Sequence, residues 1–153
     1  PMVVERQNLL DDVNKTGTAL DCAVSSELLK NIFWNKAPLH DGAVIVREGR
    51  IVGAGCMLPL SGNVNLSRDL GMRHRAGIGM SEHSDAVVVI VSEETGSISA
   101  AVGGMLKRHL APETLERLLR NELLNDNEEE KKGGQIPLLS QIFGSGRKEG
   151  DRE

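Results

Sequence analysis

Short runs of β-branched apolar residues alternate along the chain with segments of helical periodicity. Ala43–Val46 and Ile51–Cys56 are two such runs, and the Glu48-Gly49 turn between them predicts a hairpin of buried strands. Asp85–Val91 has the pattern of a core strand, and Ser97–Val102 follows it after a polar turn as a second hairpin partner. The chain is therefore expected to contain two strand pairs.

Helical periodicity is found in three segments. Ser25 or Ser26 suits the N-cap of a first helix, and Pro112 suits the first turn of a last one. Arg73–Ser81 is also helical in character, although each glycine inside it costs about 1 kcal/mol relative to alanine. The expected apolar faces are Leu28, Leu29, Ile32 and Phe33 in the first helix and Leu115, Leu118, Leu119 and Leu123 in the last.

The remaining segments complete the outline. Met2–Arg6 is typical of the end of a strand, Asn8–Gly17 of a polar connector, Thr18–Val24 of a weakly extended segment and Met57–Leu70 of a loop. Strand pairs interleaved with helices favour an α/β fold with a central mixed β-sheet flanked by helices. Residues 1–125 are expected to form one domain, and residues 126–153, rich in charge and glycine, a flexible C-terminal tail.

Composition narrows the class of protein. With 153 residues, 39% of them hydrophobic, the chain is long enough for one substantial core. A net charge of −4 and an aromatic content of 2% disfavour a protein that binds a nucleic-acid backbone or stacks its bases. No apolar run is long enough to span a bilayer, and two cysteines without a CxxC motif indicate a reducing, cytoplasmic setting.

The first polar cluster, Leu39–Ala43, stands where a loop enters a strand. Gly42 would allow a ligand to approach the backbone, Asp41 could act as an acceptor or metal ligand, and His40 could bind a divalent cation or move a proton. A plain Asp-Gly turn beside a surface histidine explains the same residues, and spacing alone favours that simpler interpretation.

The second cluster, Gly71–Arg75, places two guanidiniums around an imidazole at an expected helix start. Arginine binds phosphate oxygens bidentately and a helix N-terminus adds free N–H groups, so this triplet suits a polyphosphate. A solvated helix start that pairs with Glu82 or Asp85 is the alternative. A lone basic triplet in an acidic domain favours phosphate.

The third cluster, Ser92–Gly96, follows the core strand. A serine and two carboxylates there could bind ribose or a metal-bound water, since ligands of α/β proteins usually lie at one edge of the sheet. A solvated hairpin turn is the alternative, and without further information it is the preferred one.

Taken together and in this order, five motifs resemble the diadenylate cyclase domain family over Val3–Leu124, most closely its membrane-tethered bacterial type. The motifs are Leu39–Ala43, Gly55–Ser61, Arg73–Ala76, Ser81–Asp85 and Val91–Gly96. The resemblance implies that two ATP molecules condense into cyclic di-AMP and two pyrophosphates, with Mg²⁺ or Mn²⁺. Because each adenylate would act as nucleophile and electrophile in turn, a transient two-fold homodimer with facing sites is expected.

The resemblance also assigns roles to residues. The expected catalytic residues are Asp41, Arg73, His74 and Arg75, and the expected metal contacts are His40 and Asp41. The expected nucleotide contacts are Gly42, Ala43, Met57, Leu58, Met72, Arg73, Ser92 and Glu94. Asp41 would activate the 3′-hydroxyl or help to place the metal, the basic triplet would hold the phosphates, and Met57 and Leu58 would line the adenine slot.

Two positions depart from the family pattern. Met57 stands where many relatives carry Tyr, and Met72 where they carry Thr, so an aromatic contact and a hydroxyl hydrogen bond would be missing. A nucleotide sensor without turnover is therefore an alternative function. Relatives carry transmembrane helices before the matched stretch, which predicts that this chain is the cytoplasmic domain of a membrane-anchored bacterial protein, with no membrane contact or nucleic-acid partner of its own.

Overall fold

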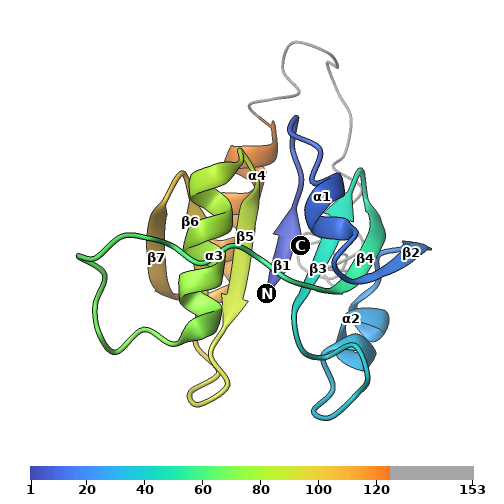
Figure 1. Cartoon of the computed structure of the whole chain (residues 1–153), viewed down its shortest axis with the longest axis horizontal. Coiled ribbons are helices and arrows are strands. Elements are labelled where there is room, and N and C mark those ends of the chain that lie inside the picture. Colours follow the sequence, from blue (N-terminus) through green and yellow to red (C-terminus); the bar gives the residue numbers. More distant parts are fainter. Residues whose placement is uncertain (125–153) are drawn as a thin grey trace, which may run out of the picture.

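The fold is a seven-stranded mixed sheet covered by helices on both faces, described here for residues 1–124 by a computed structural model (Figure 1). The strands are β1 (Met2–Val4), β2 (Thr18–Ala23), β3 (Ala43–Arg47), β4 (Arg50–Cys56), β5 (Val87–Val91), β6 (Ile98–Val102) and β7 (Met105–Leu110). The helices are α1 (Asp11–Asn14), α2 (Ser26–Ile32), α3 (Met72–His83) and α4 (Pro112–Leu124). The expected α/β class with a mixed sheet is confirmed, whereas the predicted tail at 126–153 lies outside the described residues.

Strand β1 lies at the centre of the sheet, whose order is β2-β4-β3-β1-β5-β6-β7. It pairs in parallel with β3, where Val3 faces Ile45, and antiparallel with β5, where Val3 faces Val88. The two predicted hairpins, β3–β4 and β5–β6, therefore form the two halves of the sheet, and β1 joins them. The edges are β2 and β7.

Alternate residues of the central strands supply two separate cores. Val44, Val46 and Val87 pack on the face covered by α2 and α4, whereas Ile45 and Val88 pack on the face that carries α3. Because helices cover both faces, the strands are apolar at successive positions instead of alternating with polar residues. This explains the continuous β-branched runs of the sequence.

Helix α3 contains two glycines, and one of them, Gly77, is explained by the close contact between the helix and the sheet. A Cβ at Gly77 would lie 2.6 Å from the Cδ1 atom of Ile90 on β5, so only glycine lets the helix lie this close to the strand. The cost of about 1 kcal/mol in helix propensity is thus exchanged for close packing of α3 on the sheet. The N-cap expected for α2 is confirmed, because the Ser25 hydroxyl accepts a hydrogen bond of 3.1 Å from the Leu28 N–H.

Two elements differ from the sequence-based prediction. The segment expected to be a plain connector, Asn8–Gly17, contains the short helix α1, and β7 was not predicted at all. Strand β7 is an edge strand with a largely exposed sequence, so it carries no apolar alternation that could reveal it. The Gly103-Gly104 turn before it has positive φ at both residues, as its sequence indicates.

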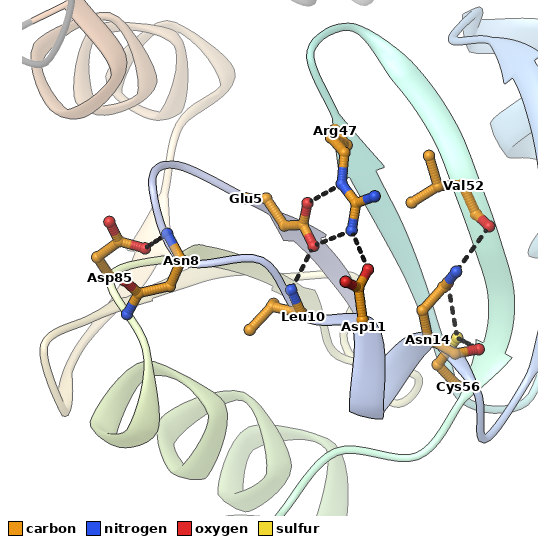
Figure 2. Close-up of polar contacts among 9 residues, drawn as sticks. All are labelled: Glu5, Asn8, Leu10, Asp11, Asn14, Arg47, Val52, Cys56 and Asp85. Atoms are coloured by element: carbon orange, nitrogen blue, oxygen red, sulfur yellow. Dashed lines mark hydrogen bonds and ion pairs between the residues drawn. The ribbon is translucent and has the colours of Figure 1, made fainter.

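A buried ion pair fastens the segment after β1 to β3 (Figure 2). The Glu5 side chain is 1% exposed and accepts hydrogen bonds from Arg47 at 2.5 and 3.0 Å and from the Leu10 N–H at 2.7 Å. Arg47 also donates to Asp11 at 2.8 Å, and these bonds, above all those to Glu5, raise the pKa of the guanidinium above its usual value. One buried carboxylate thus fixes β3, the connector and the start of α1.

Replacement of Glu5 should therefore be costly. We expect Glu5→Ala to lower the free energy of unfolding by about 2–3 kcal/mol, because it leaves Arg47 and a buried N–H group without their partner. Asp11→Ala removes only the exposed arm of the network and should cost less than about 1 kcal/mol. Urea denaturation of both variants measures the difference, and equal losses would contradict the central role of Glu5.

His74, in the first turn of α3, is buried with 8% of its surface exposed. Burial lowers the pKa of the imidazole, and Arg108 acts in the same direction while Asp69 opposes it. Below about pH 6.5 the unfolded chain then binds a proton at His74 that the folded chain does not, so the free energy of unfolding decreases as the pH falls.

The pH dependence of stability should therefore change when this histidine is removed. Between pH 7.5 and 5.5, the parent is expected to lose more unfolding free energy than the His74→Gln variant, as measured by urea denaturation at each pH. Parallel stability profiles of parent and variant would show that the imidazole is not held in its neutral form.

Candidate nucleotide site

Three segments that are distant in sequence meet at one end of the sheet, where the loop before β3 and the β5–β6 turn both lie (Figure 1). A cavity of about 460 Å³ at this end is lined by Phe33, Asn35, His40, Arg73 and Glu93. Pro1, next to β1, is also located here, near the charges of Arg73, Asp41 and Glu93. The first and second predicted clusters are therefore brought together.

The backbone before β3 is tightly constrained and fixes the position of Asp41. Gly42 has a φ of +97°, and a Cβ there would lie 2.7 Å from the carbonyl carbon of Gly55. Ala43, the next residue, is fully buried and pairs with Cys56 on β4. Gly42 therefore serves the close packing of β3 on β4, while the Asp41 side chain remains exposed to solvent.

His40 has one ring nitrogen committed and one left for a ligand. Its Nδ1 atom lies 2.7 Å from the carbonyl oxygen of Ala37, which can only accept, so Nδ1 carries a proton, and in the neutral form of the ring Nε2 carries the lone pair. A metal-binding histidine usually donates its other ring N–H to a carbonyl in this manner. Within residues 1–124 no group of three or more His, Cys, Asp or Glu side chains could hold a metal. His40 and Asp41 are adjacent candidate ligands, one imidazole nitrogen and one carboxylate, and two such groups are fewer than that.

The three residues of the basic triplet point to different surroundings. Arg73 lines the cavity and forms an ion pair with Glu93 on the β5–β6 turn. His74 is buried, and Arg75 donates to backbone carbonyls of the preceding loop. Successive residues of a helix are about 100° apart, so these three side chains leave the helix axis in different directions. The alternative partners Glu82 and Asp85 are occupied elsewhere, by Ser61 and by backbone N–H groups of residues 7 and 8.

The N-terminus of α3 adds backbone donors beside Arg73. Gly71 is the N-cap and has no side chain that could accept from the first turn, where the Met72, Arg73 and His74 N–H groups lack intrahelical acceptors. A Cβ on Gly71 would meet no atom within 4 Å, so the approach to this helix end is open. Arg73 and the helix end together offer a positive environment for an anion.

The other predicted nucleotide contacts lie outside the set of residues that line the cavity. Met57 and Met72 are 73% and 66% exposed, and Leu58 packs partly against the α3-side core. The Ser92 hydroxyl accepts a hydrogen bond of 3.3 Å from the Thr95 N–H, which places it within its own turn, and Glu94 is exposed. The carboxylate that reaches the cavity is Glu93, the neighbour of the expected Glu94.

Sequence reasoning missed three of the residues that line the cavity. The helical periodicity places Phe33 on the apolar face of α2, no motif includes Asn35, and the sequence marks Glu93 only as one member of the third cluster. No pattern distinguishes Glu93 from Glu94, because the conformation of the turn decides which of two adjacent carboxylates turns inward. The loop position of Phe33 and Asn35 likewise depends on where α2 ends.

The chain matches proteins of known activity over most of its described length. Cyclic di-AMP synthase CdaA of Bacillus subtilis is 48% identical over 121 residues, and a diadenylate cyclase of Listeria monocytogenes is 47% identical over 121 residues. Each match covers 79% of this chain but only 44% of the relative, so the chain spans less than half the length of these curated relatives.

Solved structures show the same architecture. A crystal structure of a double mutant of DacA from Staphylococcus aureus superposes with a TM-score of 0.77 and 46% identity, covering 80% of this chain and 81% of that one. A hypothetical membrane spanning protein from Bacillus cereus superposes with a TM-score of 0.69 and 45% identity, covering 72% of this chain and 54% of that one.

The match to a family model agrees with these relatives and with the motif order. The DAC model, described as the DisA bacterial checkpoint controller nucleotide-binding family, matches residues 1–106. Those residues contain the cavity and all five motifs from which the resemblance was inferred. The chain therefore belongs to the DAC family, the diadenylate cyclase domain family that its sequence motifs resemble.

Proposed function

We propose that this chain is a diadenylate cyclase that condenses two ATP molecules into cyclic di-AMP and two pyrophosphates. The observation that carries the proposal is that the loop with His40 and Asp41 meets Arg73 of α3 at one end of the sheet in a member of this family. A carboxylate, a possible metal ligand and a phosphate-binding guanidinium are the groups that nucleotidyl transfer requires.

The proposed reaction forms and breaks one bond at each α-phosphorus. The 3′-oxygen of one ATP bonds to the α-phosphorus of the other, the bond to the pyrophosphate oxygen breaks, and the hydroxyl proton leaves. The exposed Asp41 carboxylate accepts that proton or serves as a metal ligand. Arg73 exchanges Glu93 for phosphate oxygens and, with the backbone N–H groups of α3, offsets the charge on the leaving pyrophosphate.

Bound Mg²⁺ or Mn²⁺ would supply charge neutralisation at the phosphates, and we assign its protein contacts to His40 Nε2 and Asp41. Gly42 and Ala43 are proposed as backbone neighbours of the nucleotide, although their packing on β4 leaves them little free space. Met57, Leu58, Met72, Ser92 and Glu94 remain proposed nucleotide contacts. His74 is buried with a lowered pKa, so we assign the permanent positive charge at the phosphates to Arg73.

Turnover with ATP and Mn²⁺ tests the proposal, and Asp41→Asn tests its chemistry. The variant should lower kcat at least about 100-fold, because an amide neither accepts a proton at neutral pH nor replaces a carboxylate on the metal. Asp41 is exposed, so thermal stability and ATP affinity should change little. Asp12→Asn, an exposed acid on α1, is the matched control and should keep full activity.

Product formation is measured by chromatography of cyclic di-AMP, and nucleotide binding by calorimetry. Tight ATP binding without any product would favour the nucleotide sensor. Parental turnover by the Asp41→Asn variant would remove this carboxylate from the mechanism.

We also propose that the active species is a transient two-fold dimer. The cavity is lined by a single Arg73 and lies next to a single Asp41, which suits one ATP, whereas the product needs two. Two copies with facing cavities would let each 3′-hydroxyl reach the α-phosphate of the other nucleotide. Such a contact must open to admit ATP and to release product.

Specific activity should accordingly rise with enzyme concentration between nanomolar and micromolar and then reach a plateau. The measurement compares initial rates per chain with the mass from light scattering over the same range. A flat specific activity from a protein that scatters as a monomer throughout would contradict the dimer.

The proposed setting is the cytoplasmic face of a membrane. Within residues 1–124 no helix is both long and apolar enough to cross a bilayer. The structural neighbour from Bacillus cereus is described as membrane spanning, and this chain covers 54% of it. We infer that the domain described here is one part of a longer, membrane-anchored protein.

A further inference from the structure

The loop that joins β4 to α3, residues 57–71, turns back along the helix that it precedes and is held at both of its ends. At its near end, the Ser61 N–H donates to the Arg75 carbonyl at 3.0 Å, and the Ser61 hydroxyl donates to Glu82 at 2.5 Å. At its far end, the Arg75 side chain donates from Nε to the Leu70 carbonyl at 3.2 Å and from Nη2 to the Ser67 carbonyl at 3.1 Å. Arg75 therefore takes part at both ends.

Gly79 of α3 also shows that the 57–71 loop lies in a defined position on the helix. A Cβ at this position would lie 2.6 Å from the carbonyl carbon of Leu60 and 2.6 Å from the nitrogen of Ser61. The loop thus crosses α3 in direct contact with its backbone, at a helical position where a side chain is absent. The second unfavourable glycine of α3 is explained by this crossing, as Gly77 is explained by the sheet.

The guanidinium of Arg75 binds the 57–71 loop and is not among the groups that line the cavity. Two different nitrogens of its planar fork donate to two carbonyl groups, a fixed spacing that the single nitrogen of an ammonium group does not reproduce. Arg73 and Arg75 are two residues apart on the helix, about 200° around its axis. Arg73 contacts Glu93 and lines the cavity, and the residues that line the cavity do not include Arg75.

We propose that Arg75 is a positioning residue, not a phosphate ligand: it holds the 57–71 loop on α3 and thereby fixes the helix N-terminus that carries Arg73. This inference rests on the proposed function only in naming the nucleotide as the ligand of that helix end. The loop also begins with Met57 and Leu58, so the same clamp sets the position of both proposed adenine contacts relative to Arg73.

A phosphate ligand and a positioning residue respond differently to the number of phosphates on the nucleotide. Removal of a phosphate ligand reduces affinity for ATP more than for ADP, and for ADP more than for AMP, since the lost attraction grows with the charge of the ligand. Removal of a clamp that contacts no phosphate reduces affinity for all three by the same factor.

The experiment measures dissociation constants of AMP, ADP and ATP by calorimetry for the parent and for Arg73→Ala, Arg75→Ala and Arg75→Lys. Arg75→Ala should weaken all three by a common factor of about ten, and Arg75→Lys should do the same although it keeps the charge. Arg73→Ala, on the same helix, should show a loss that increases from AMP to ATP. A loss at Arg75→Ala that increases with phosphate number and is rescued by lysine would overturn the proposal.

Amide hydrogen exchange of residues 62–71 provides a readout that needs no nucleotide. Both Arg75 variants should exchange faster than the parent in this segment by about tenfold, whereas Arg73→Ala should match the parent. Unchanged exchange in Arg75→Ala would overturn the clamp. If the parent binds none of the nucleotides, the proposed function fails, while the exchange data still decide the role of Arg75.

Discussion

The three-residue strand β1 is the constraint on which the rest of the structure depends. The hairpins β3–β4 and β5–β6 do not pair with each other, and β1 supplies the backbone hydrogen bonds that join them, parallel on one side and antiparallel on the other. Because β1 is buried, Glu5, the residue that follows it directly, is buried as well. The carboxylate of Glu5 is neutralised by Arg47 of β3. The site depends on the same strand, because β1 starts between the loop that carries Asp41 and the turn that carries Glu93.

The parts of the fold that the sequence predicts correctly are those whose burial leaves a local pattern. The β3–β4 and β5–β6 hairpins combine β-branched runs with turn residues, and α4 presents Leu118, Leu119 and Leu123 to one face of the sheet as its periodicity indicates. Strand β7 leaves no such pattern, because a solvent-facing edge strand needs only one partner and can carry charged residues. Helix α1 is four residues long, below the length at which periodicity can be recognised.

The site shows a similar division between local and non-local information. Motif order identifies the family and the segments that form the cavity, but not which side chain of each segment enters it. Asp41 and Arg73 lie at the same end of the sheet, Arg75 faces a loop, and the residue of the third cluster that lines the cavity is Glu93. The rotation of the helix points the members of the triplet in different directions. The conformations of the 57–71 loop and of the β5–β6 turn are decided by tertiary contacts that a linear motif does not record.

The ion pair between Arg73 and Glu93 makes the cavity a balanced ionic environment instead of an exposed positive charge. A polyanion that binds there replaces one carboxylate by another anionic partner and leaves the exposed Glu93 without its ion pair. An arginine that is already paired with a carboxylate holds fewer solution ions than an unpaired arginine, so fewer ions are released when a ligand binds. The affinity of the site should therefore depend less steeply on salt concentration than the charge of the ligand alone would imply. The protein can thereby distinguish an anion that fits both Arg73 and the helix end from the many simple anions around it, which must compete with a carboxylate already in place.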